Sequence, residues 1–193
     1  MDINYGRKIP REIDNFFDNI MIDLASYLSG FFKKINFNPN HLTTIGNIFG
    51  IFCINYLLSK NYKYSAFCYF ARYLFDCLDG FYSRKYNMET EFGDNYDHYS
   101  DYIFFIITTY ILFQKVNFKN NQYFKIIYLL LSLTASIQLG CTEHFFKTKD
   151  KTNTHLSNLI NICPKKNFIN IIKYFGSGSF ILFVIISLLY YIK

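Results

Sequence analysis

Long apolar segments constrain this chain more than any other feature of its sequence. Five of them, each 15 to 20 residues long, cover residues 42–58, 64–83, 95–114, 126–140 and 174–192. Segments of this length cross the core of a lipid bilayer when they are helical. None of them alternates apolar and polar residues as a barrel strand would. The sequence therefore predicts an all-α, polytopic bundle of transmembrane helices.

The composition agrees with a membrane protein. Only 18% of the 193 residues are charged and 51% are hydrophobic, whereas soluble chains carry about 25% charged residues. These values exclude intrinsic disorder and collagen-like or coiled-coil architectures. The net charge of +6 arises from Lys and Arg that lie between the apolar segments, which is typical of membrane flanks rather than of a nucleic-acid-binding surface. The charged first 30 residues do not resemble a signal peptide.

The distribution of basic residues predicts the orientation in the membrane. Thirteen Lys and Arg lie on the side of the N-terminus and six on the opposite side, and basic residues accumulate on the cytosolic side. We therefore expect a multi-pass protein with a cytosolic N-terminus, in an endoplasmic-reticulum-type membrane if the source is a eukaryote or a virus of one. The length predicts a single domain, residues 1–193, with the transmembrane bundle in residues 42–192.

Residues 11–34, before the first apolar segment, are amphipathic. Apolar residues recur with the 3.6-residue period of a helix, and acidic residues occupy the other face. The apolar set is Ile13, Phe16, Phe17, Ile20, Met21, Leu24, Tyr27, Leu28 and Phe31, and the acidic set is Glu12, Asp14, Asp18 and Asp23. This pattern predicts a helix that lies along the membrane interface, the alternative being a helix packed on a soluble domain. Pro39 and Asn40 are expected to break the chain before the first membrane segment.

Four aspartates lie at the ends of the second and third apolar segments. Asp76 and Asp79 are three residues apart, and Asp97 and Asp101 are four apart, so each pair shares one side of a helix. The predicted topology brings both helix ends to the cytosolic side through a tight loop, so all four carboxylates are expected to converge. Acidic groups inside a membrane segment are costly and indicate function by default. The alternative is that they cap helices or pair with Lys and Arg.

Four carboxylates in one pocket repel each other unless a cation is bound. Hard divalent ions prefer oxygen ligands, and Mg²⁺ or Mn²⁺ fits best, most simply as two ions that hold a diphosphate. Arg84 offers a guanidinium for phosphate. Gly80 and Gly93 lack side chains where a nucleotide diphosphate would approach the backbone.

Residues 76–101 resemble the CDP-alcohol phosphotransferase family. The family signature is D-x2-D-G-x2-A-R-x8-G-x3-D-x3-D, and every position matches except that Ser83 stands in place of Ala. Residues 39–43, Pro-Asn-His-Leu-Thr, are similar to the P-N-x-[LI]-T segment that opens the first membrane span of the family near the nucleotide. The signature has eight fixed positions with fixed gaps, which makes the resemblance specific.

The resemblance implies a role for each matching residue. Asp76, Asp79 and Asp97 would hold the metal ions, and Asp101 would be a metal ligand, the general base, or both. The residues expected to contact the CDP moiety are Asn40, Thr43, Gly80, Ser83, Arg84, Thr90 and Gly93. Family members usually have six spans, so a sixth is either hidden in residues 153–173 or missing.

The resemblance also implies the reaction: a substituted phosphate passes from a CDP-linked donor to an alcohol or lipid acceptor, and CMP is released. CDP-diacylglycerol and CDP-choline or CDP-ethanolamine are both open as donors. Membrane lipids are expected partners, a homodimer is open, and nucleic acid is not expected. His98 gives the local pattern D-H-x-x-D, which looks like the choline and ethanolamine branch and makes His98 a second candidate base beside Asp101. Arg72, one turn from Asp76, would pair with an aspartate or contact a lipid phosphate.

Two other functions fit aspartate-rich membrane helices. An intramembrane prenyltransferase also binds a diphosphate through aspartate pairs, but its motifs lie on more widely separated spans of a longer bundle. A divalent-cation transporter could use acidic coordination, but it would not need Gly80, Arg84 and Gly93 at fixed gaps.

Overall fold

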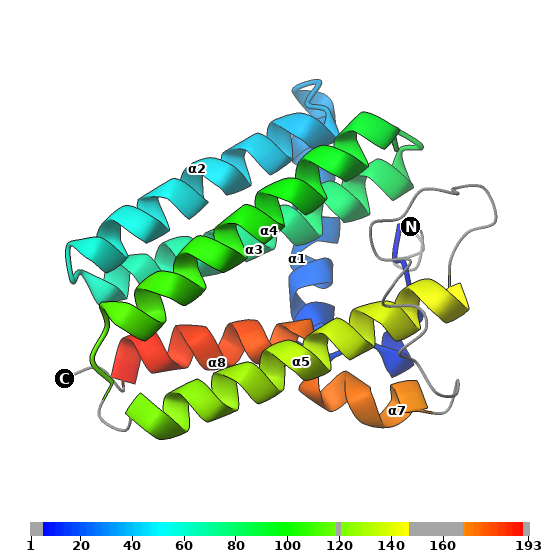
Figure 1. The fold of residues 1–193 in the computed structure, drawn as a ribbon. Coiled ribbons are helices and arrows are strands. Elements are labelled where there is room, and N and C mark those ends of the chain that lie inside the picture. The colour runs from blue at the N-terminus through cyan, green and yellow to red at the C-terminus, as the bar shows by residue number, and fades with distance from the viewer. Residues whose placement is uncertain (1–5, 119–120, 147–167, 191–193) are drawn as a thin grey trace.

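The computed structural model describes residues 6–118, 121–146 and 168–190, and the regular elements in these ranges are all helices (Figure 1). This confirms the predicted all-α bundle. The elements are η1 (Arg11–Ile13), α1 (Phe16–Lys34), α2 (Pro39–Leu58), α3 (Tyr62–Lys85), α4 (Glu91–Gln114), α5 (Asn121–Phe146), α7 (Ile169–Ile172), η3 (Lys173–Phe175) and α8 (Ser177–Tyr190).

The five apolar segments of the sequence correspond to α2, α3, α4, α5 and α8. Within the described residues, three helical stretches are long and apolar enough to cross a membrane: Pro39–Leu58, Asn121–Thr142 and Ile169–Tyr190. Helices α3 and α4 have 24 residues each, but they carry the charged residues of the aspartate motif. Most of residues 153–173, the predicted place for a sixth span, lies outside the described residues.

Helix α2 begins earlier than the sequence predicted. Pro39 does not break the chain but occupies the first turn, where its missing N–H is no loss. The Asn38 side chain accepts from the His41 backbone N–H, and the His41 side chain accepts from the Asn38 backbone N–H. This reciprocal capping box starts the helix three residues before the expected residue 42, so Asn40 and Thr43 lie in its first two turns.

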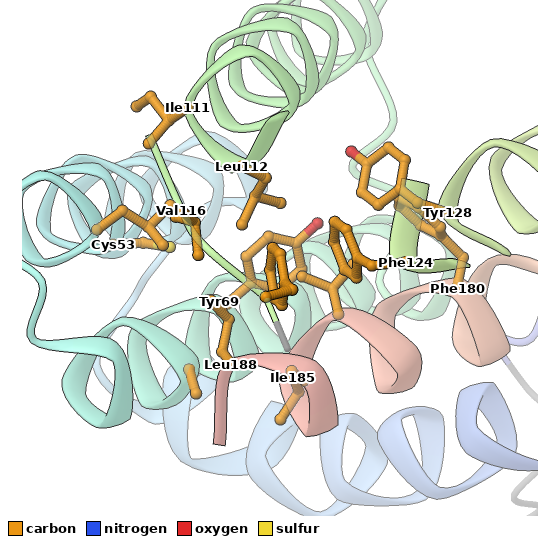
Figure 2. Close-up of a cluster of buried hydrophobic side chains, with 14 of the residues drawn as sticks. Cys53, Tyr69, Ile111, Leu112, Val116, Phe124, Tyr128, Phe180, Ile185 and Leu188 are labelled. Carbon is orange, nitrogen blue, oxygen red and sulfur yellow. The ribbon is translucent and has the colours of Figure 1, made fainter. Parts of the chain in front are cut away.

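The long helices form two layers (Figure 1). In the upper layer of Figure 1, α2 packs against both α3 and α4, and beneath it α5 and α8 pair with each other, with α8 packed against α3. Between the layers lies the main apolar core, which includes Tyr69, Leu112, Tyr128 and Phe180 (Figure 2). Its aromatic rings pack closely, as between Tyr128 and Phe180, whose centroids are 4.9 Å apart. This core fixes the relative position of the helices that carry the aspartates.

Helix α1 runs at a steep angle to the long helices and packs against α3 and α8 (Figure 1). Phe16, Tyr27 and Phe31 of this helix are exposed, whereas Met21 is buried. The exposed apolar side chains are consistent with a helix at the membrane interface.

Two of the acidic residues assigned to the polar face, Asp14 and Asp18, are buried rather than exposed. Asp18 accepts hydrogen bonds from the hydroxyls of Tyr73 and Ser177, and these partners offset the cost of burying a carboxylate.

Candidate active site

Three of the four signature aspartates meet between α3 and α4. Asp76, Asp97 and Asp101 each offer one carboxylate oxygen, and these oxygens lie within 4.8 Å of one another. Asp97 and Asp101 are one turn apart on α4, so their side chains lie on the same side of that helix. This side is directed towards Asp76 on α3. Among the described residues this is the group of acidic side chains that is arranged to hold a cation.

Asp79, the fourth aspartate, has a different partner. Its Oδ2 accepts a hydrogen bond of 2.7 Å from the Thr43 hydroxyl of α2, and its side chain is buried. It therefore lies outside the group of three, although it lines the same cavity as Asp76 and Asp97. The hydrogen bond ties the start of α2 to the aspartate motif of α3, and so places Thr43 at the site.

Arg72 was predicted either to pair with an aspartate or to contact a lipid phosphate. The structure shows the first, a salt bridge with Asp101. The Arg72 Nη2 lies 2.8 Å from Asp101 Oδ1, and the guanidinium stacks over the Phe104 ring, 4.3 Å from the centroid. Gly50 on α2 makes this position accessible, because a Cβ there would lie 3.1 Å from Arg72 Cδ and Nε. Arg72 is therefore held on three sides while it fixes one oxygen of Asp101.

A cavity of about 300 Å³ opens on Asp76, Asp79 and Asp97. All seven residues predicted to contact CDP line it: Asn40, Thr43, Gly80, Ser83, Arg84, Thr90 and Gly93. They come from the starts of α2 and α4 and from the end of α3, three elements that are separated in sequence. The Arg84 Nε donates to the Gly6 carbonyl, 2.8 Å away, so the guanidinium is anchored inside this cavity.

Gly80, Gly93 and Thr90 also have structural roles, which the sequence did not reveal. A Cβ on Gly80 would lie 3.2 Å from Arg84 Nη1, and one on Gly93 would lie 2.8 Å from Asn40 Oδ1. Gly80 thus makes room for Arg84, and Gly93 lets α4 approach α2. The Thr90 hydroxyl caps α4 by accepting from the Gly93 N–H. Ser83 donates to the Gly80 carbonyl of its own helix.

His98 is fixed by the helix turn before it. Its Nδ1 lies 2.8 Å from the Asp94 carbonyl oxygen, and because a carbonyl only accepts, Nδ1 carries the hydrogen. The lone pair of the neutral ring is then on Nε2, which is the form that a general base requires. His98 lines the same cavity as Asp97, but it is not a member of the group of three.

One wall of this cavity was not predicted from the sequence. It is formed by the N-terminal segment, α5 and α8. The wall includes Asp14, Asp18, Gln138 and Ser177. The Ser177 N–H donates to Gln138 Oε1 at 2.9 Å, which caps α8. Burial raises the pKa of Asp14 to about 7 and also raises the pKa of Asp18. The one local signal was the Gly-Ser-Gly-Ser run at residues 176–179, whose small side chains permit this close packing.

Comparison with known proteins points in the same direction as the site. The model of the CDP-alcohol phosphatidyltransferase family matches residues 36–190, which is most of the chain. This range contains both the aspartate motif and the Pro39–Thr43 segment. No curated protein and no solved structure gives a significant match.

Proposed function

Since the chain belongs to the CDP-alcohol phosphatidyltransferase family, whose members are transferases of phospholipid synthesis, we propose that it is an integral membrane enzyme of this reaction. It transfers a substituted phosphate from a CDP-linked donor to the hydroxyl of an alcohol and releases CMP. One observation carries the proposal. The group formed by Asp76 and Asp97 with Asp101 adjoins the cavity that all seven predicted nucleotide-contacting residues line.

The residues at this position fit a divalent cation, which the family uses. Three carboxylates whose oxygens lie within 4.8 Å of one another are hard ligands of the kind that Mg²⁺ and Mn²⁺ prefer. We propose that Asp76, Asp97 and Asp101 hold the metal, with Asp79 close to a second ion. Bound there, the ions would neutralise the diphosphate and stabilise the charge that develops on the departing CMP.

The protein's own side chains account for the remaining steps. Asp101 accepts the proton of the acceptor hydroxyl, and Arg72 keeps one oxygen of that carboxylate in place. The acceptor oxygen attacks the β-phosphorus, and the bond between this phosphorus and the oxygen that bridges to CMP breaks. Arg84, anchored by the Gly6 carbonyl, donates to phosphate oxygens. Positioning and electrostatics supply most of the rate in phosphoryl transfer.

The proposed orientation follows from the charge bias. The N-terminus and the connection between α3 and α4 lie on the cytosolic side, where CDP-linked donors are available, in an endoplasmic-reticulum-type membrane if the source is a eukaryote or a virus of one. The N-terminal segment and the aspartate motif meet at one cavity, through Lys8 and Arg84, and their placement on one side of the membrane is consistent with this. Whether the protein forms a homodimer stays open.

Release of CMP by the purified protein tests this function. The protein in lipid–detergent micelles is incubated with CDP-diacylglycerol or with CDP-choline or CDP-ethanolamine, together with a panel of alcohols. We expect CMP and a phospholipid product from one donor class, loss of both in EDTA, and recovery with Mg²⁺ or Mn²⁺. Full turnover in EDTA contradicts the proposed site.

The same preparation separates the two other functions. Pyrophosphate released from a prenyl diphosphate would indicate a prenyltransferase. Uptake of Mn²⁺ into sealed vesicles without CMP release would indicate a transporter. Either result, with no turnover of any CDP-linked donor, replaces the proposal.

A further inference from the structure

A second cavity borders the carboxylates beside the cavity of about 300 Å³ described above, which is the proposed nucleotide cavity. It has a volume of about 450 Å³ and lies between α3, α4, α5 and α8. Away from the carboxylates its walls are largely apolar and aromatic, with Tyr69, Phe104, Phe105, Phe180 and Ile181 among the lining residues. Tyr69 and Phe180 also belong to the apolar core (Figure 2). The cavity therefore has one charged end and an apolar body, which is the shape of an amphiphile.

The signature residues divide between the two cavities in an informative way. Asp76, Asp97 and His98 line both of them. Asp79 and Arg84 line the nucleotide cavity, whereas Asp101 lines the apolar one. Both candidate bases thus border the apolar cavity. His98 borders both cavities, but Asp101, the proposed base, lines the apolar cavity and not the nucleotide cavity. A hydroxyl that gives its proton to Asp101 would therefore approach from the apolar cavity.

The small residues of α5 create the space. Ser132, Ala135 and Ser136 line the cavity with Leu139, at the i, i+3, i+4 and i+7 positions of one helix face. The Ser132 and Ser136 hydroxyls donate to carbonyls of their own helix, Leu129 and Ser132. Their hydrogen-bonding capacity is therefore largely used within the helix, and this wall offers little polarity to a ligand.

Some of the side chains that line the cavity are also exposed on the outer surface of the helices. Two lining residues, Tyr102 on α4 and Leu139 on α5, are 44% and 41% exposed. The α5 wall lies within Asn121–Thr142, one of the stretches apolar enough to cross a membrane. Helices α4 and α5 converge at their connection and diverge towards the end that carries the aspartates (Figure 1). With α5 spanning the membrane as proposed, this arrangement would let a lipid reach the carboxylates from the side, without leaving the bilayer.

We infer that the acceptor is a lipid alcohol, a glycerolipid with one free hydroxyl such as diacylglycerol. It occupies the apolar cavity. This inference rests on the proposed function and deepens it. The donor is then the soluble class, a CDP-linked small alcohol such as CDP-choline or CDP-ethanolamine. The lipid O–H bond gives its proton to the base, the lipid oxygen bonds to the β-phosphorus, and CMP leaves with the bridging oxygen.

Substrate pairing provides the first test. The full-length protein in micelles receives either CDP-choline or CDP-ethanolamine with dioctanoylglycerol, or CDP-diacylglycerol with inositol, serine or glycerol phosphate. We expect CMP release in the first arm alone. CMP release confined to the second arm overturns the inference while the proposed function stands, because the cavity then holds the acyl chains of the donor. No CMP in any arm contradicts the proposed function itself.

Filling the cavity provides the second test. Ser136→Phe places a ring inside it, and we expect at least a tenfold rise in KM for dioctanoylglycerol with an unchanged KM for the CDP-linked donor. The matched control is Leu133→Phe, on the same helix at a 59% exposed position that does not line the cavity, and it should leave both values unchanged. An unchanged lipid KM in a folded Ser136→Phe protein overturns the inference.

A chain-length series on the unmodified protein needs no variant. Each methylene group buried in the cavity is worth about fourfold in kcat/KM. Shortening the acyl chains of the acceptor from eight carbons to six should therefore lower kcat/KM at least tenfold, when substrate is supplied below its micelle-forming concentration. Equal kcat/KM values for short-chain acceptors contradict burial of the chains in the cavity.

Discussion

Arg72 forms a salt bridge with Asp101, the proposed base, and we expect it to hold that carboxylate in place. It is a buried cation held by Phe104, Gly50 and Asp101. Replacing it by Met removes the ion pair but keeps a flexible side chain in the same space. We expect kcat to fall at least tenfold with little change in KM for the CDP-linked donor, because a displaced catalytic group costs rate rather than binding. Steady-state kinetics provide the measurement.

Arg72→Lys distinguishes positioning from charge alone. Lys retains the charge but lacks the planar guanidinium that both pairs with Asp101 and stacks on Phe104. We expect a rate between those of Arg72→Met and the natural protein. A normal kcat in folded Arg72→Met protein contradicts a positioning role.

His98 and Asp101 are the two candidate bases, and their surroundings differ. Asp101 belongs to the group of three carboxylates and pairs with Arg72, whereas His98 is tied to the Asp94 carbonyl. We expect Asp101 to be the base and His98→Gln to retain most of the turnover, since Gln can still donate to that carbonyl. The measurement is kcat together with Mn²⁺ affinity. An inactive variant that binds Mn²⁺ normally would make His98 the base.

The start of α8 packs closely against α1, and this contact shapes the cavity wall that the N-terminal segment, α5 and α8 form. A Cβ on Gly178 would lie 2.3 Å from Asp18 Oδ1 and 2.5 Å from Asn15 Oδ1. Both oxygens belong to buried residues, so they cannot move without losing partners. We expect Gly178→Ala to lower the Tm of the purified protein by roughly 3–10 °C, as overpacking commonly does.

The matched control is Gly30→Ala on α1, where a Cβ meets nothing within 4 Å. Ala is favoured over Gly inside a helix, so this variant should have an equal or slightly higher Tm. A Gly178→Ala protein as stable as Gly30→Ala would show that the contact between α1 and α8 is looser than described here.

The N-terminal segment should make stability depend on pH. Burial and the neighbouring Asp18 raise the pKa of Asp14 to about 7, although Arg7 opposes this. An unfolded Asp loses its proton near pH 3.9. Between about pH 4 and pH 7 the folded state therefore binds the extra proton, and the stability contributed by protonated Asp14 declines as the pH rises.

Asp14→Asn mimics the protonated side chain and tests this dependence. Its Tm should approach that of the natural protein only below about pH 4, and it should exceed the natural Tm by a margin that grows up to about pH 7 and persists at about pH 8. The matched control is Glu12→Gln, at an exposed position of the same segment, and it should leave the slope unchanged. A Tm difference between Asp14→Asn and the natural protein that is the same at about pH 4 and at about pH 8 contradicts the raised pKa.

At the scale of the whole molecule, the sequence predicted those features whose interacting residues are close together in the chain. The five apolar segments correspond to five helices, and the spacing of Asp97 and Asp101 brings both carboxylates to Asp76. Helical periodicity fixes such relationships because neighbours three or four residues apart share a face. The family resemblance also named seven residues that prove to line the proposed nucleotide cavity, although their contacts with CDP stay predictions.

The features that the sequence did not predict depend on contacts between residues far apart in the chain. Asp79 is drawn to Thr43, 36 residues away, and Asp18 to Ser177, 159 residues away. A helical wheel places Asp18 on the polar face and cannot show that another helix covers that face. The apolar cavity was equally invisible, since it forms where α4 and α5 diverge and no single segment encodes it.

The central claim is that Asp76, Asp97 and Asp101 form one metal-dependent centre for CDP-linked transfer. Its most direct test is the rate of Mg²⁺-dependent CMP release by Asp97→Asn compared with Glu91→Gln, an exposed position on the same helix that lines neither cavity. Each variant removes one negative charge from α4. We predict a loss of at least a hundredfold for Asp97→Asn and a normal rate for Glu91→Gln. Equal rates for the two variants, with both proteins folded, would contradict the account.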